Sequence, residues 1–266
     1  MRPRRHGPVP RGRAGATSGL LALALALAAC VDAPNGAGAG QGADAARPEA
    51  DRPGGAPQAI DVDPSRPVLL VPGWFDTGRD VSGLHARLVA VGWPEEWVRT
   101  VVFEDPTGGN REHADELHRA VLGVLEATGA DTVDIVAHSM GGLATRWYLL
   151  REDRAPVRRV AFLATPHRGT VSAHLAWGAG RDEMLPDSPF LDTLNAAPPV
   201  PPGVEAITIR TPIETHVIPP ENGTLPGVPD FEVCCPTHDA LPEDPATFIL
   251  VRRFLLDGAE ALPRGP

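Results

Sequence analysis

Short runs of apolar residues alternate along this chain with longer stretches in which apolar residues recur every three or four positions. The runs that predict buried strands lie at residues 67–71, 98–103, 132–137, 157–164, 206–210 and 231–235. Helical periodicity is found at residues 81–91, 112–127, 140–150 and 245–256. Strands that alternate with helices are typical of a parallel sheet covered on both faces. The pattern therefore predicts a doubly wound, mostly parallel α/β sheet of about six strands.

The strand pattern at residues 132–137 leads directly to Ser139, and a helical pattern begins at Met140. A serine hydroxyl is a weak nucleophile, so it must be exposed, within reach of a base and beside hydrogen-bond donors. A sharp turn between a strand and a helix meets these needs at the cost of a strained backbone. The sequence therefore predicts a nucleophile elbow, and the alternative is a chance serine at a helix start. The neighbours expected to support the elbow are Ala137, His138, Gly141 and Gly142.

Residues 1–58 differ in composition from the rest of the chain. Five arginines and no acidic residue precede an apolar run at residues 20–29, which ends at Cys30. The sequence from Leu27 to Cys30 resembles the lipobox of bacterial lipoproteins, in which the signal peptide is cut before a cysteine that receives a lipid. We expect a signal peptide at 1–29, a lipidated Cys30 with a flexible tether at 30–58, and a catalytic domain at 59–266. An ordinary secretory peptide and a membrane span are the alternatives, and the run is short for a span.

Charge restricts the classes of partner. The chain has 34 acidic against 24 basic side chains and contains no lysine, and five of its arginines lie in the predicted signal peptide. An acidic protein without a basic patch is a poor candidate for binding nucleic acid. We therefore expect no nucleic-acid partner.

Three local sequences together resemble the small bacterial lipases of the α/β-hydrolase superfamily, most strongly the minimal, nearly lidless kind. These sequences are residues 137–142, 165–170 and 184–191. The resemblance covers roughly residues 67–256 and is more specific than any one of the motifs. It implies a single α/β-hydrolase domain that cleaves acyl esters or lipids and needs no metal and no organic cofactor.

The resemblance also assigns the partners of the serine, because the acid and the histidine follow it in the chain of such hydrolases. Glu214 stands where the similar lipases have Asp, and His238 lies between a strand and the last helix, where their histidine lies. His216 is too near Glu214 in sequence to come from a separate loop. If Glu214 is only an exposed loop carboxylate, Asp192 or Asp230 would be the acid.

The strand at residues 67–71 ends in a Pro-Gly turn followed by Trp74. In an α/β-hydrolase this position supplies one half of the oxyanion hole, so the backbone N–H groups of Trp74 and Met140 are the expected donors. Pro72 replaces the more usual His, but the hydrogen-bond donor is a backbone N–H group, so this replacement need not harm catalysis. The alternative is a plain turn from strand to loop.

Apolar side chains between residues 171 and 203 are expected to form the wall that receives an acyl chain, with a short helix near 173–177 and too few residues for a large lid. His138 and His167 are expected to shape the floor of the pocket. We expect the protein to be a monomer.

Two other groups of residues suggest different chemistry. His113 and His118 lie five residues apart on one predicted helix, on different faces, so a solvated helix face is expected rather than a metal site. Cys234 and Cys235 can close only a vicinal disulfide, and two free buried thiols are the alternative. No zinc site can be built from this pair alone.

The same site residues are compatible with other activities. An acyltransferase or a thioesterase would use the same serine, histidine and acid with a different acceptor or donor. A binding lipoprotein without catalytic activity is a third possibility. The export signal predicts a location at the outer membrane or cell surface, held by the N-terminal lipid anchor, or secretion.

Overall fold

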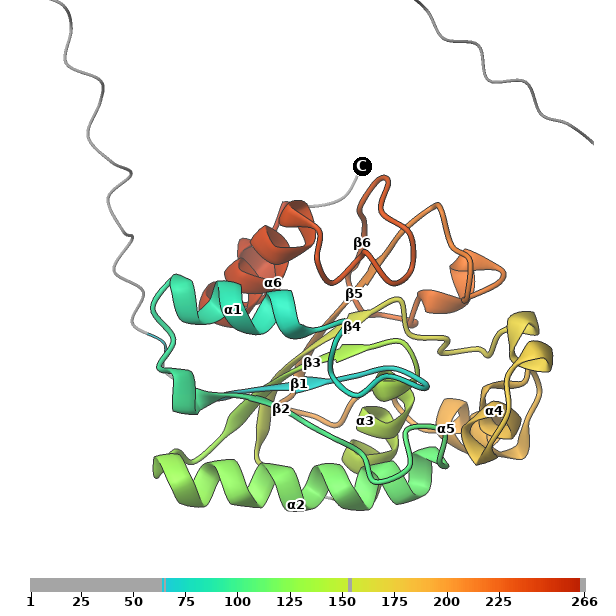
Figure 1. The fold of residues 1–266 in the computed structure, drawn as a ribbon, viewed down its shortest axis with the longest axis horizontal. Coiled ribbons are helices and arrows are strands. Elements are labelled where there is room, and N and C mark those ends of the chain that lie inside the picture. Colours follow the sequence, from blue (N-terminus) through green and yellow to red (C-terminus); the bar gives the residue numbers. More distant parts are fainter. Residues whose placement is uncertain (1–63, 65, 153–154, 264–266) are drawn as a thin grey trace, which may run out of the picture. The chain divides into compact units, whose positions relative to one another are not determined.

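The computed structural model describes residues 64, 66–152 and 155–263 (Figure 1). The predicted signal peptide, Cys30 and the tether lie outside these residues. Within the described part of the chain, contacts group the residues into one unit, and none of its helices is both long and apolar enough to cross a membrane.

A parallel sheet of six strands forms the centre of the fold, in the order β2-β1-β3-β4-β5-β6. The strands are β1 (Val68–Val71), β2 (Val98–Thr100), β3 (Val133–His138), β4 (Val157–Leu163), β5 (Glu205–Arg210) and β6 (Asp230–Glu232). The predicted sheet type and strand number are confirmed. The two edge strands are shorter than the sequence predicted, because β2 pairs with β1 over only three residues and β6 pairs with β5 over three.

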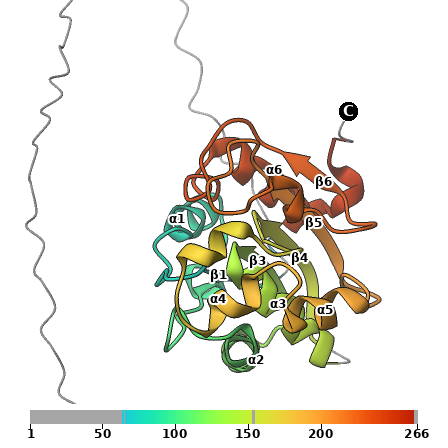
Figure 2. The same cartoon turned by 90° about the vertical axis from the view of Figure 1, so that its right-hand side faces the viewer.

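Helices cover both faces of the sheet (Figures 1 and 2). The helices are α1 (Ser82–Ala90), α2 (Asn110–Thr128), α3 (Met140–Arg151), α4 (Ala179–Met184), α5 (Pro189–Ala196) and α6 (Pro245–Asp257). Figure 2 shows α1 and α6 on one side of the sheet and α2 and α3 on the other, with α4 in front of one end of the strands. The predicted short helix near 173–177 is a 3-10 turn at Val171–Leu175.

The core has two parts because successive side chains of a strand point to opposite faces. In β1, Leu69 and Val71 pack in the cluster that contains α2 and α3, whereas Val68 and Leu70 pack in the cluster that contains α1 and α6. All four side chains are almost fully buried. A strand buried on both faces is apolar at most positions, which explains the nearly continuous apolar runs in the sequence.

Helix ends are defined by local residues. Ser188 accepts a hydrogen bond from the N–H of Leu191 at the start of α5, and Asp244 caps α6 in the same way. Each of these helices begins with a proline, which suits the first helical turn. Gly129 ends α2 in the left-handed conformation at φ 70°.

Candidate active site

Ser139 occupies a strained turn between β3 and α3. Its φ is 52° and its ψ is −129°, a conformation that few residues with a side chain adopt. The N–H of Ser139 donates to the carbonyl of Leu163 in the neighbouring β4 at 2.8 Å, which holds the turn in place. The turn has the conformation expected for a nucleophile elbow.

The small neighbours of Ser139 allow this turn to pack closely. A Cβ atom on Gly141 would collide with the carbonyl oxygen of Pro72, and one on Gly142 would collide with the side chain of Thr165. Ala137 is fully buried within β3. The two glycines therefore provide the space that a side chain would fill.

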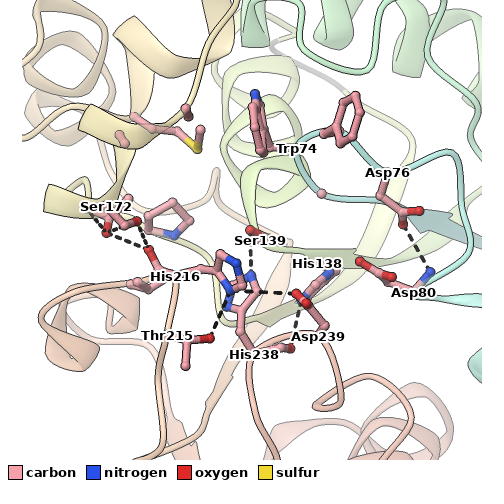
Figure 3. Close-up of a pocket in the computed structure, with 18 of the residues that line it drawn as sticks. Trp74, Asp76, Asp80, His138, Ser139, Ser172, Thr215, His216, His238 and Asp239 are labelled. Atoms are coloured by element: carbon pink, nitrogen blue, oxygen red, sulfur yellow. Dashed lines mark hydrogen bonds and ion pairs between the residues drawn. The ribbon is translucent and has the colours of Figure 1, made fainter. Parts of the chain in front are cut away.

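Three side chains form a continuous hydrogen-bonded chain beside this turn. The Oγ of Ser139 lies 2.9 Å from Nε2 of His238, and the Nδ1 of His238 lies 2.8 Å and 3.0 Å from the two carboxylate oxygens of Glu214. Figure 3 shows the hydroxyl of Ser139 facing the ring of His238. The three residues follow β3, β5 and β6, so the parallel sheet brings them together at the carboxyl ends of its strands.

Glu214 is held by the backbone that follows it. Its side chain is only 1 % exposed, and its Oε2 accepts hydrogen bonds from the N–H groups of His216 and Val217 at 3.1 Å and 2.6 Å. Burial by itself would raise the pKa of this carboxyl. The hydrogen bond to His238, the charge of His238 and the hydrogen bonds from the two backbone N–H groups lower the pKa by more than burial raises it. The pKa of Glu214 is therefore lowered, and the group is ionised at neutral pH.

The loop after β1 lies directly against the serine. A Cβ atom on Gly73 would lie 2.9 Å from the Cβ of Ser139 and 3.5 Å from its Oγ. Trp74 is the next residue in this loop. Met140 is the first residue of α3, where a backbone N–H has no acceptor inside the helix. The backbone of both predicted donors is thus next to Ser139.

Ser139 and His238 open into a cleft of about 720 Å³. One wall of this cleft is apolar, and we call it the aromatic wall: Trp74, Phe75, Leu175 and Trp177. The ring centroid of Trp177 lies 4.5 Å from that of Trp74 and 5.1 Å from that of Phe75, in edge-on arrangements. Phe75, Leu175 and Trp177 are 60 %, 87 % and 54 % exposed, so the wall continues to the molecular surface.

Polar side chains also line the cleft, and we call four of them the acidic rim: Asp76, Asp80, His216 and Asp239 (Figure 3). Burial, followed by the charges of Asp76 and Asp239, raises the pKa of Asp80 to about 6. Neither Asp80 nor Asp239 was predicted from the sequence as a residue of the site. Their position beside His238 depends on the packing of distant loops, and the only sequence signal is the position of Asp239 next to His238.

His216 lies beside His238 without joining the hydrogen-bonded chain. The ring centroids of the two histidines are 4.7 Å apart, and the Nδ1 of His216 is 3.7 Å from Oδ1 of Asp239. One ligand atom from each of His216, His238 and Asp239 lies within 4.8 Å of the others. Among the described residues, this group has the donors and spacing from which a metal site could be built.

The two histidines predicted for the pocket floor differ in position. His138 is buried in the cleft, and its Nε2 donates to the backbone carbonyl of His238 at 3.3 Å. Burial, followed by the neighbouring His238, lowers the pKa of His138 well below its ordinary value, so the ring is neutral. His167 does not line the cleft, which corrects the prediction, because its ring is buried against that of Phe162, nearly perpendicular to it, with centroids 4.9 Å apart.

The solvated face predicted for His113 is also wrong. His113 is 1 % exposed, stacks on Phe103 with ring centroids 3.9 Å apart, and its Nε2 lies 2.7 Å from the carbonyl oxygen of Asp105. The loop after β2 covers this part of α2, which periodicity within the helix alone does not reveal. His118 is partly exposed.

The structure also places the two alternative acids, Asp192 and Asp230, and the cysteine pair. The carboxylate bonded to Nδ1 of His238 is that of Glu214. Asp230 instead lies 2.9 Å from the guanidinium of Arg210, and Asp192 is in the first turn of α5. Cys234 and Cys235 are bonded to each other through their sulfur atoms, and both are exposed rather than buried.

Known proteins share this architecture. Residues 66–195 match the family model described as alpha/beta hydrolase fold. Among solved structures, the mature lipase BlEst2 of Bacillus licheniformis is 16% identical with a TM-score of 0.60, over 76% of this chain and 96% of that chain. Aspergillus fumigatus lipase B is 17% identical with a TM-score of 0.60, over 72% and 52% of the respective chains.

The product of the gene lin2722 of Listeria innocua is 15% identical with a TM-score of 0.55, over 73% of this chain and 94% of that chain. At such identities the likeness concerns the fold. Together with the sheet order and the flanking helices, these matches show that the chain has the α/β-hydrolase fold in a single domain, as the sequence predicted.

Proposed function

We propose that this protein is a serine hydrolase that cleaves carboxylic esters of acyl chains, in the manner of a lipase or esterase. The observation that supports this proposal most strongly is the hydrogen-bonded chain of Ser139, His238 and Glu214 at the base of an open cleft. Nucleophile, base and orienting acid are each within hydrogen-bonding distance of the next.

In the proposed reaction, the Oγ of Ser139 attacks the ester carbonyl while Nε2 of His238 accepts the hydroxyl proton. Glu214 accepts the hydrogen bond from Nδ1 of His238, which keeps Nε2 free as the base and stabilises the charged ring. The N–H groups of Trp74 and Met140 donate to the oxyanion that forms on the carbonyl oxygen.

The tetrahedral intermediate then collapses. His238 returns its proton to the oxygen of the leaving alcohol, and an acyl-enzyme on Ser139 remains. A water molecule gives a proton to His238 and attacks the acyl carbon, and the second collapse releases the carboxylic acid and restores the serine hydroxyl.

The aromatic wall supports an acyl chain as the substrate group. Its side chains are apolar, line the same cleft as Ser139 and continue to the surface, so a chain attached to the acyl carbon can pack against apolar side chains along its length. Two of the solved structures with this fold are named as lipases.

The test is hydrolysis of p-nitrophenyl esters with short and long acyl chains. We expect Ser139→Ala and His238→Ala to lower kcat by about 10⁴-fold or more. His174→Ala, at an exposed histidine that does not line the cleft, serves as the matched control and should retain activity. An active Ser139→Ala variant, or a parent protein that a fluorophosphonate does not label, would refute the proposal. Analysis of the products in the presence of an added alcohol separates hydrolysis from acyl transfer.

A further inference from the structure

We propose that the mouth of the cleft binds a divalent transition metal ion of the Zn²⁺ type through His216, Asp239 and His238, and that the bound ion blocks ester hydrolysis. The blocking effect rests on the proposed function. Binding itself does not depend on it, because it needs only the three side chains.

The positions of the three donors support this site. Their ligand atoms lie within 4.8 Å of one another, and the Nδ1 of His216 is 3.7 Å from Oδ1 of Asp239. Donors of a tetrahedral zinc site lie about 2.0–2.2 Å from the ion, and therefore about 3.3 Å from each other. The donors must close by about 1.5 Å at most to reach that spacing.

The side chains that have to move are free to do so. The side chains of His216 and Asp239 are 55 % and 64 % exposed, and within the described residues His216 Nδ1 has only one other close partner, the Oγ1 of Thr215 at 3.1 Å. His238 is fixed by Glu214 and provides the rigid donor. Two exposed ligands can thus close on a buried one.

The charge and chemistry of the rim select the kind of ion. Asp76, Asp80 and Asp239 line the cleft together with one arginine, Arg79, so the acidic rim attracts positive ions. Two imidazoles and one carboxylate favour Zn²⁺ or a similar transition metal over Ca²⁺ or Mg²⁺, which prefer oxygen ligands. Water can complete the fourth position.

A metal ion at this site would prevent the activation of Ser139 by His238. The Nε2 of His238 is the atom that lies 2.9 Å from Ser139 Oγ and accepts its proton in the proposed reaction. A nitrogen whose lone pair is shared with a metal ion cannot accept that proton. The ion therefore competes with activation of Ser139, and its removal restores activity.

Binding is tested first, in Ser139→Ala protein without an affinity tag and after treatment with a chelator. Titration calorimetry with Zn²⁺ should show one ion per chain at this site, and Co²⁺ should give the absorption of a tetrahedral complex. Adding His216→Ala or Asp239→Asn should weaken binding by at least about tenfold. The matched controls His174→Ala and Asp182→Asn, which change exposed residues outside the cleft, should not. Equal binding in all four variants would overturn the site.

Inhibition is tested in protein with an intact serine. Zn²⁺ should slow both ester hydrolysis and labelling by a fluorophosphonate, and EDTA should restore both. The inhibition constant, measured against the metal-free rate of each variant, should rise by at least about tenfold in His216→Ala and Asp239→Asn. Unchanged inhibition in these variants, or activation by Zn²⁺, would refute the inference. A metal-free parent without hydrolysis would refute the proposed function, and the calorimetry would still decide the metal site.

Discussion

At the scale of single residues, Glu214 determines how His238 is used. The carboxylate receives two backbone N–H bonds and holds Nδ1 of His238, so the ring can present only Nε2 to Ser139. Glu is one methylene longer than the Asp that the resemblance implied at this position, and the N–H groups of His216 and Val217 hold its carboxylate. The orientation of the base is therefore fixed by one side chain and two amides.

Replacement of Glu214 by Gln tests this role. The amide has no charge and no longer selects one tautomer of His238, so we expect kcat to fall by about 10³–10⁴-fold with little change in KM. Stopped-flow or steady-state kinetics with a p-nitrophenyl ester measure the effect. Glu126→Gln, at an exposed position of α2, is the control. Full activity of Glu214→Gln would mean that another group orients the histidine.

Asp80 predicts a dependence of stability on pH. Its pKa is raised from 3.8 to about 6, chiefly by burial and then by Asp76 and Asp239. Because the folded state holds this proton more tightly than the unfolded state, stability is lost as pH rises from about 4 to about 6. The side chain of Asp80 makes no hydrogen bond within the described residues, so Asp80→Asn removes mainly the charge.

We therefore expect Asp80→Asn to melt at a higher temperature than the parent at pH 7 and at the same temperature at pH 4. Calorimetric Tm values at the two pH values give the comparison. A difference in Tm that does not change with pH would show that packing, and not ionisation, is responsible.

At the scale of elements, the elbow depends on close contact between α3 and the loop after β1. We expect Gly141→Ala to destabilise the protein by about 1–3 kcal/mol and to reduce activity strongly, because the new methyl group meets the backbone of Pro72. Gly123→Ala in α2 is the matched control: a Cβ there has no atom within 4 Å, so it should stabilise the fold by about 0.4–1 kcal/mol. Urea unfolding of both variants measures the effect. Equal stabilities would contradict the packing argument.

The 3-10 turn at Val171–Leu175 and the residues after it present the outer part of the aromatic wall. An acyl chain that covers about 60 Å² of Trp177 gains roughly 1.5 kcal/mol, or about tenfold in kcat/KM. Trp177→Ala should therefore lower kcat/KM about tenfold for long-chain esters and little for acetate. Ile249→Ala, at an exposed apolar position of α6, is the control. Equal losses for acetate and long chains would place the acyl chain elsewhere.

Elements were easier to predict from the sequence than their surroundings. The strands and the elbow follow from local patterns, because burial on both faces and a tight turn each require particular residues in consecutive positions. His113 was mispredicted because the loop that covers it lies outside its helix. Asp80 and Asp239 were missed because only tertiary packing brings the loop after β1 beside the loop after β6. The position of Glu214 came from a resemblance rather than from any local pattern.

At the scale of the whole molecule, the sheet collects residues from distant parts of the chain at one end. We propose in addition that a lipid on Cys30 holds this domain at a membrane surface, which the composition of residues 1–58 supports. In a bacterial host, the parent should then fractionate with membranes and incorporate a labelled fatty acid. Cys30→Ser should do neither, whereas Asp32→Ala should behave as the parent does. Membrane association of Cys30→Ser would contradict lipid anchoring.

The distance in sequence between Ser139 and His238 also has a consequence in time. The two residues are 99 positions apart, and Glu214 precedes His238 by 24. At about 5–20 residues per second, synthesis of the intervening chain takes roughly 5–20 s. During that interval Ser139 exists without the base of the proposed reaction, so we expect that a nascent or truncated chain that lacks the loop carrying His238 does not attack an ester. Because His238 lies near the end of the domain, the proposed reaction of Ser139 cannot begin until nearly the whole domain has been made.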